Sequence, residues 1–78
     1  MFIVWTEVSE SRFDEMLGMV PPALTMAKGF LVGEPVDYDR DGLPRFAAFI
    51  QHDGKFYECT QPLTRGQFRW FSPQHLSV

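Results

Sequence analysis

The dipeptide Asp53-Gly54 lies between two apolar segments rich in aromatic residues, and it constrains the fold of this chain more than any other feature. A type I′ turn requires positive φ at both central residues, and Asp-Gly is one of the few pairs that accept this conformation. The sequence therefore predicts an antiparallel hairpin, with strands over residues 45–51 and 55–60. In this register Ile50 pairs with Tyr57, which fixes the side chains that share each face.

The strict alternation of side chains along a strand separates the hairpin into two faces. One face is predicted to be core, packed under an amphipathic helix, and it holds Phe46, Ala48, Ile50, Tyr57 and Cys59. The other face is mixed in character, as is typical of an antiparallel sheet that is open to water. It places Phe49 and Phe56 as diagonal neighbours, and two exposed rings would mark an interaction site. The alternative is that the C-terminal helix covers them.

The remaining elements follow from local signals along the chain. Strands are predicted over residues 2–6 and 30–36, the second at a sheet edge because Pro35 lies near its end. A helix begins near Ser9, carries an apolar stripe over Phe13, Met16, Leu17 and Val20, and ends at Pro21-Pro22. A further turn through Leu24 and Met26 is compatible with Pro22. Residues 37–44 are predicted to be a polar loop.

Thr64 and Gln67 have the spacing of a capping box, which predicts a short helix over residues 65–71, ended by Pro73. The expected fold class is therefore α+β, with the order β-α-β-β-β-α in a single domain over residues 1–78. The sheet is expected to be small and antiparallel, with three or four strands and a helix packed on one face. A chain of 78 residues buries about 60% of its unfolded surface, so little more can be built.

Cysteine content and hydropathy bear on where such a chain works. Its one cysteine excludes an internal disulfide, and small secreted domains usually depend on several. We therefore expect a cytoplasmic protein. The longest apolar run is far below the roughly 20 residues of a membrane span, so we expect no membrane partner.

Charge is distributed unevenly along the chain, whose net charge is −3. Eight acidic and three basic residues precede Gly42, a net of −5, whereas two acidic and four basic residues follow it, a net of +2. Such asymmetry is typical of a charged interaction surface, although it also occurs on solvated faces that bind nothing. The negative total argues against nucleic acid as the main partner.

The segment Asp37-Tyr38-Asp39-Arg40-Asp41-Gly42 has the D-x-D-x-D-G pattern that opens an EF-hand loop. Ala48 stands where the bidentate Glu should be, and strands rather than helices flank the loop, so we expect no metal. The segment is then either a solvated turn or an acidic surface for a basic partner.

In the second interpretation the carboxylates of Glu34, Asp37, Asp39 and Asp41 would face a basic surface shaped to hold phosphates. Tyr38 would be the aromatic anchor, because interface energy concentrates in Tyr, Trp and Arg. The predicted partner-binding residues are thus Glu34, Asp37, Tyr38, Asp39, Asp41, Phe49 and Phe56.

Catalytic chemistry is not indicated. Cys59 falls on the predicted core face, and neither His52 at the turn nor His75 near the end has reason to lie beside it. Zinc-type ligand spacing and a glycine-rich phosphate loop are both missing, so we expect no cofactor. The stretch from Arg65 to Phe71 interleaves basic and aromatic residues, which can grip single-stranded nucleic acid or simply form an amphipathic helix.

Four segments carry a resemblance: Gly29-Phe-Leu-Val-Gly-Glu-Pro-Val, Arg45-Phe-Ala-Ala-Phe, Asp53-Gly-Lys-Phe-Tyr-Glu and Phe68-Arg69. Over about residues 10–71 the chain resembles uncharacterised small proteins carried by bacterial plasmids and prophages. Small acidic α+β proteins of that origin include anti-CRISPR inhibitors, which bind effector subunits and block DNA loading or cleavage. The resemblance implies a mode of action and assigns no functional residue.

The function expected from these observations is that of a non-catalytic inhibitor or adaptor, of the anti-CRISPR type. It would bind a host protein or nucleoprotein complex as a monomer or a homodimer, with an edge at residues 30–36 available for pairing. The alternative is a small nucleic-acid-binding module that uses Arg45, Lys55, Arg65, Arg69 and Trp70. A calcium-regulated module is a third possibility.

Overall fold

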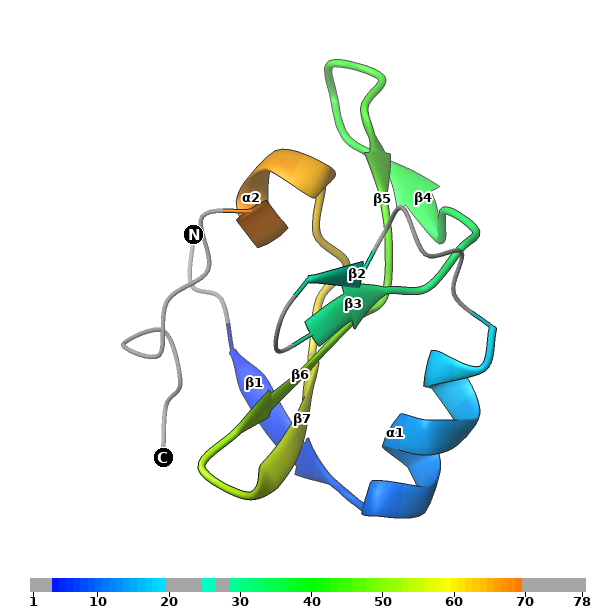
Figure 1. The fold of residues 1–78 in the computed structure, drawn as a ribbon. Helices are drawn as coiled ribbons and strands as arrows, with labels where there is room; N and C mark the ends of the chain where they lie inside the picture. Colours follow the sequence, from blue (N-terminus) through cyan, green and yellow to red (C-terminus); the bar gives the residue numbers. More distant parts are fainter. Residues whose placement is uncertain (1–3, 20–24, 27–28, 70–78) are drawn as a thin grey trace.

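The computed structural model describes residues 4–19, 25–26 and 29–69 (Figure 1). Its elements, in chain order, are β1 (Trp5–Val8), α1 (Glu10–Leu17), β2 (Thr25–Met26), β3 (Gly29–Leu31), β4 (Asp37–Tyr38), β5 (Pro44–Arg45), β6 (Ala48–His52), β7 (Lys55–Cys59) and α2 (Arg65–Arg69). The α+β fold class is confirmed. Over the described residues no helix has the length and apolar character needed to cross a membrane.

The main sheet is antiparallel and has the strand order β1-β7-β6-β3-β2. It contains five strands within the described part of the chain, one more than the largest number predicted, because residues 25–26 pair with β3 instead of forming a helical turn. This pairing shows that the prediction of a sheet edge at residues 30–36 is wrong for β3. Strand β3 has β6 on one side and, at Gly29 and Phe30, β2 on the other, so it is not an edge strand at these residues.

The β6–β7 hairpin is confirmed in its turn and its register. Asp53 and Gly54 have φ of 54° and 77°, the positive values that a type I′ turn requires. Ile50 lies opposite Tyr57, as the turn predicts. The first strand begins later than expected, at Trp5, and it pairs with β7 as an edge strand.

Both helix starts lie where side-chain caps predict them. The Ser9 hydroxyl accepts a hydrogen bond from the Arg12 amide at 3.2 Å. At α2 the Thr64 amide donates to Gln67 Oε1 at 3.0 Å, and the Gln67 amide donates to Thr64 Oγ1 at 3.2 Å. This reciprocal pair is the predicted capping box. Such caps satisfy amides that have no partner inside the helix.

Helix α1 ends earlier than predicted, at Leu17, with Gly18 as its C-cap. Glycine is a poor helix former, so the helix stops there and does not run on to the Pro21-Pro22 pair. Phe13 is buried and Met16 is half-buried, whereas Leu17 is exposed. Of the three described positions of the predicted stripe, Phe13 and Met16 therefore face the sheet and Leu17 does not. Val20, Pro21, Pro22, Leu24 and Pro73 lie outside the described residues.

Two segments predicted as single strands are interrupted. The stretch 45–51 divides into β5 and β6 because Phe46 leaves the sheet ladder and pairs with Leu63, with N–H···O distances of 2.7 and 2.9 Å between their backbones. Within the stretch 30–36 the strand ends at Leu31. One more backbone hydrogen bond follows it, from the Val32 amide to the Ala47 carbonyl. Both departures lead the chain out of the sheet and into β4 and β5.

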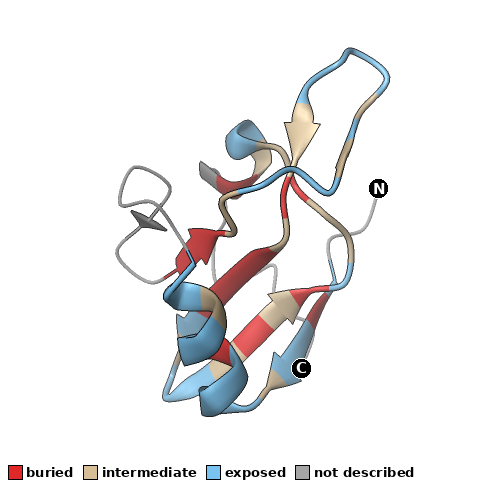
Figure 2. Ribbon diagram, turned by 90° about the vertical axis from the view of Figure 1, so that its right-hand side faces the viewer, coloured by how far each residue is buried: buried red, intermediate tan, exposed pale blue. Residues whose placement is uncertain are grey.

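The sheet is covered on both faces, and the helices lie on the faces opposite to those predicted. One core cluster, shared with α2, consists of Trp5, Leu31, Phe46, Ala48, Ile50, Tyr57, Cys59, Leu63 and Phe68. The other lies under α1 and consists of Phe13, Phe30 and Phe49, with Phe56 among the partly buried residues packed on it. Figure 2 shows α1 against the buried strands. Burial on both faces gives a two-sided core.

Candidate functional site

A two-stranded hairpin projects from the body of the protein, and we call residues 34–45 the arm (Figures 1 and 2). Strands β4 and β5 pair antiparallel, with Asp37 opposite Arg45 and Tyr38 opposite Pro44. The Val36 amide donates to the Arg45 carbonyl at 2.8 Å, and the Asp39 amide donates to the Leu43 carbonyl at 2.9 Å. The segment predicted as a polar loop is thus a structured hairpin.

The tip of the arm is a tight turn held by one carboxylate. Asp39 Oδ1 accepts hydrogen bonds from the amides of Asp41 and Leu43, both at 2.9 Å. Gly42 has φ of +81°, and its amide donates to the Asp39 carbonyl at 3.0 Å. A type I turn followed by a left-handed residue is the usual three-residue hairpin connection. Asp39 is therefore a structural residue of the turn, because its carboxylate accepts hydrogen bonds from two backbone amides of the turn.

The base of the arm is held by an ion pair. The Arg45 guanidinium donates from Nε to Asp37 Oδ1 at 2.6 Å and from its second nitrogen to Asp37 Oδ2 at 2.5 Å. The hydrogen bonds from Arg45 lower the pKa of Asp37, and those to Asp37 raise the pKa of Arg45. A bidentate pair of this kind fixes geometry as well as charge. Asp37 and Arg45 thus neutralise each other.

One side of the arm is apolar and exposed. Tyr38 and Pro44 are opposite each other in register, and Val36 lies two residues from Tyr38, so all three fall on the face away from Asp37 and Arg45. Val36 and Tyr38 are each 64% exposed, and Leu43 beside the turn is 52% exposed. Among the described residues the other large hydrophobic side chains that are exposed are Val4, Leu17 and Met19. Leu43 lies two residues from Arg45 and therefore falls on the opposite face of the arm. We call Val36, Tyr38 and Leu43, the exposed apolar residues of the arm, the apolar triad.

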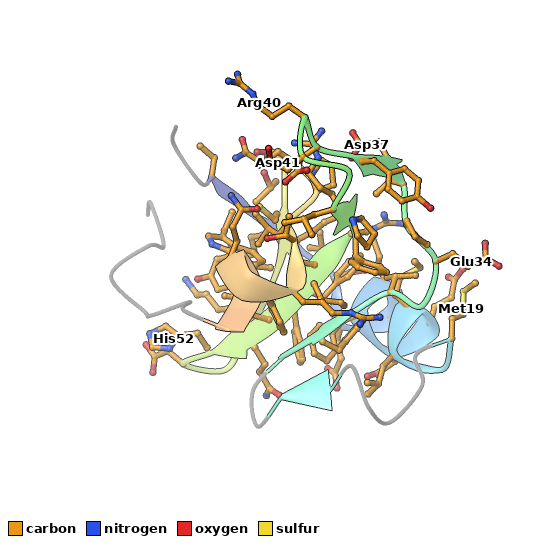
Figure 3. The ribbon with its side chains drawn as sticks, turned by 90° about the horizontal axis from the view of Figure 1, so that it is seen from above. Met19, Glu34, Asp37, Arg40, Asp41 and His52 are labelled. Atoms are coloured by element: carbon orange, nitrogen blue, oxygen red, sulfur yellow. The ribbon has the colours of Figure 1, made fainter. Side chains whose placement is uncertain are left out.

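The acidic residues predicted in this region do not act alike. Asp37 is paired with Arg45 and Asp39 holds the turn, whereas Glu34 and Asp41 are exposed and have no ion-pair partner among the described residues. Figure 3 shows Arg40 reaching outward at the tip and Glu34 at the edge of the molecule. In the described ranges no three His, Cys, Asp or Glu side chains form a group that could hold a metal ion.

The prediction that Phe49 and Phe56 form an exposed pair is wrong. Phe49 is 0% exposed and stacks on Phe30 with ring centroids 5.3 Å apart. Phe56 is half-buried, with its ring centroid 4.8 Å from that of Phe13. The reason is that α1, and not the C-terminal helix, packs on this face. Phe49 therefore belongs to the core, and Phe56 is partly covered by α1, so the two rings do not form an exposed patch.

An ion pair between Arg12 and Glu58 also links α1 to the sheet on the face that holds Phe49. The Arg12 guanidinium donates to both carboxylate oxygens of Glu58, at 3.0 and 3.2 Å. It also lies 5.6 Å from the centroid of the Phe49 ring. The pair tethers α1 to β7 over the ring, and the hydrogen bonds that Arg12 donates to Glu58 raise the pKa of Arg12.

Cys59 is buried in the α2 cluster, as the hairpin register predicts. Burial raises the pKa of its thiol, which disfavours the reactive thiolate. His52 lies opposite Lys55 at the β6–β7 turn, and His75 is outside the described residues. The side chains described therefore do not assemble a cysteine–histidine pair.

The basic residues of the nucleic-acid alternative are dispersed. Arg45 is committed to its ion pair in β5, Lys55 is exposed on β7, and Arg65 is exposed on α2 with its guanidinium carbon 5.4 Å from the centroid of the Phe46 ring. Trp70 and the side chain of Arg69 lie outside what the structure describes. The described cations of this alternative therefore come from three separate elements, and one of them is already in an ion pair.

Sequence reasoning located much of the arm but missed Val36 and Leu43. It treated the segment as a polar loop, either a solvated turn or an acidic surface for a basic partner, and so it did not use Asp41-Gly42 as a second Asp-Gly hairpin signal between apolar residues. Comparison of the chain with models of protein families, with curated proteins and with solved structures gave no match.

Proposed function

We propose that this protein is a non-catalytic inhibitor or adaptor that binds a host protein or nucleoprotein complex through the arm. The observation that carries the proposal is the exposure of the apolar triad on a projecting hairpin whose base and tip are both fixed by hydrogen bonds. Exposed apolar side chains gathered on one feature are typical of interaction sites. A rigid loop loses less conformational entropy on binding than a flexible one, which favours affinity.

An inhibitor of the anti-CRISPR type in the bacterial cytoplasm is the specific form of this proposal. It is supported by the resemblance of residues 10–71 to small proteins of plasmids and prophages and by the net charge of −3. A surface that binds phosphates is basic, so it attracts a protein whose net charge is negative.

Affinity purification of the tagged protein from a bacterial host tests the proposal. It should be followed by interference assays with each effector complex recovered. We expect a stable complex at physiological salt and loss of the effector's activity when the protein is added. Recovery of no partner, from a protein that circular dichroism shows to be folded, would contradict it.

The nucleic-acid alternative is tested separately by gel mobility of DNA and RNA at low salt. Phosphate contacts release counterions, so a genuine interaction must weaken steeply as salt is raised. We expect no shift, because Arg45 is neutralised and the other described cations are dispersed.

A further inference from the structure

The chain contains two Asp-Gly dipeptides, and each lies in the turn of a hairpin. Asp41-Gly42 belongs to the turn of the arm, and Asp53-Gly54 forms the β6–β7 turn at the opposite end of the molecule (Figure 1). All of these residues are exposed. Aspartate followed by glycine is the pair most prone to isomerise, because glycine has no Cβ to keep its amide nitrogen away from the aspartate carboxyl carbon.

In the arm, hydrogen bonds to Asp39 hold the peptide groups on both sides of the dipeptide. The Gly42 amide donates to the Asp39 carbonyl at 3.0 Å. The amides of Asp41 and Leu43 both donate to Asp39 Oδ1 at 2.9 Å. The nitrogen that would attack the Asp41 carboxyl group is therefore engaged in a hydrogen bond, within a turn whose neighbouring amides are also engaged.

The β6–β7 turn does not hold its central peptide group in this way. His52 and Lys55 pair across the ladder, but the Gly54 amide has no hydrogen-bond acceptor within residues 4–19, 25–26 and 29–69. The Asp53 carboxylate has no donor or ion-pair partner in the same ranges. Asp53 is also the one non-glycine residue of the described chain with positive φ, at 54°. The same dipeptide thus occurs once with its amide engaged and once without.

From this difference we infer that Asp53 is a site of isoaspartate formation in the folded protein and that Asp41 is protected from the same reaction. The Gly54 nitrogen attacks Cγ of the protonated Asp53 carboxyl group, the nitrogen loses its proton, and water leaves as a succinimide ring closes. Water then adds to a carbonyl carbon of the ring. Addition at Cγ restores aspartate, whereas addition at the main-chain carbonyl carbon breaks its bond to nitrogen and leaves isoaspartate, an isomer of the same mass.

The hydrogen bonds of the arm set the size of the expected difference. Ring closure requires the peptide group after the aspartate to turn toward the side chain, so an amide that donates a hydrogen bond must first release it. One hydrogen bond of about 1 kcal/mol lowers the released population about 5-fold. We therefore expect Asp53 to isomerise at least about 5 times faster than Asp41 in the folded chain.

Isoaspartate at position 53 would also weaken the sheet. It adds a methylene group to the main chain of a two-residue turn, which then no longer fits the type I′ geometry between His52 and Lys55. The register of β6 against β7 depends on this turn, and both core clusters include side chains from these strands. We expect the isomerised protein to have a lower Tm than the fresh protein.

The experiment is storage of the purified full chain at neutral pH, well below its Tm, with samples taken over several weeks. After digestion, electron-transfer fragmentation distinguishes aspartate from isoaspartate in the peptides that contain Asp41 and Asp53. An isoaspartyl methyltransferase gives a second count, because it transfers methyl from S-adenosylmethionine to the α-carboxylate that isomerisation exposes. The chain contains no asparagine, so deamidation cannot contribute to either signal.

Two controls isolate the effect of the fold. In concentrated urea both turns are lost, so Asp41 and Asp53 should isomerise at similar rates. The variant Asp39→Ala lacks the carboxylate that holds the amides of Asp41 and Leu43. In this variant Asp41 should isomerise faster than in the wild type, while Asp53 should keep its wild-type rate. The isomerised fraction, separated by ion exchange, is then melted beside the fresh protein.

Isomerisation of Asp41 as fast as that of Asp53 in the folded wild type would overturn the inference. Reaction of Asp53 in urea but not in the folded chain would overturn it as well, because the turn would then be protective. An isomerised fraction that melts with the fresh protein would refute the effect on the sheet. The inference does not depend on the proposed function, which partner binding tests separately.

Discussion

Substitution of Gly29 by alanine is the sharpest test of how the sheet packs. A Cβ atom at this position would lie 2.6 Å from the Phe49 carbonyl oxygen, 2.8 Å from Ile50 Cγ2 and 3.1 Å from Phe68 Cζ. The first of these atoms belongs to the backbone of β6, so it cannot rotate away, and strands β3 and β6 must separate. Gly29 therefore permits the close approach of β3 to the central strand.

Overpacking of a dense core usually costs about 1–3 kcal/mol, and a clash with backbone belongs in the upper part of that range. At about 4–8 °C per kcal/mol for a domain of this size, a loss of about 2–3 kcal/mol lowers Tm by roughly 8–24 °C. Thermal melting followed by circular dichroism, with urea unfolding as a second measure, gives the value.

Gly66→Ala is the matched control, because it is the same substitution with the opposite expected sign. Among the described residues a Cβ at position 66 meets only Thr64 Oγ1, at 3.9 Å, and Gly66 lies within α2. Alanine in a helix is favoured over glycine by about 0.5–1 kcal/mol, so Tm should rise by a few degrees. A Gly29→Ala variant that melts with the wild type would refute the tight β3–β6 contact.

Three further predictions concern the core, the thiol and the arm. Phe49→Ala should cost about 3–5 kcal/mol in urea unfolding because the ring is fully buried, whereas half-buried Phe56 should cost less when it is changed to alanine. Equal losses would contradict the assignment of Phe49 to the centre of the α1 face. Cys59 should react slowly with a thiol reagent in the native protein and rapidly in urea, because burial raises its pKa and blocks access; fast native labelling would argue against burial. The folded-state pKa of Asp37 is lowered, so its contribution to the order of the arm is complete above the ordinary carboxyl pKa and is lost as pH falls through the lowered value. Amide NMR signals at the base of the arm, those of Val36, Asp37 and Arg45, should therefore move at acidic pH in the wild type and much less in Asp37→Asn; equal movement of these signals in both proteins would show that the pair does not hold the arm.

The acidic residues of the arm have different structural roles, and these must be separated before the residues are mutated. Reversal of Asp37, Asp39 and Asp41 to lysine together would change the charge of the arm and also remove the hydrogen bonds that hold the hairpin. A loss of binding in that variant would not separate the two causes. Changes at Glu34 and Asp41 leave the ion pair and the turn carboxylate in place.

The features that the sequence alone determined are local ones. Asp53-Gly54 accepts positive φ at adjacent residues, Ser9 caps α1, and Thr64 pairs with Gln67 across three residues. Each depends on groups only a few positions apart in the chain, so the sequence contains both partners of the interaction within one short segment. The β6–β7 register follows from the turn for the same reason.

Only the tertiary structure decided which helix covers which face of the sheet. Both faces of the β6–β7 hairpin carry large apolar side chains, so the alternation of period two cannot tell a face under α1 from a face under α2. The choice depends on how β1 pairs with β7 and on where Phe46 leaves the ladder to meet Leu63, contacts between residues far apart in sequence. Those pairings buried Phe49 and left Val36, Tyr38 and Leu43 exposed, because the chain between β3 and β6 is drawn off the sheet as a separate hairpin.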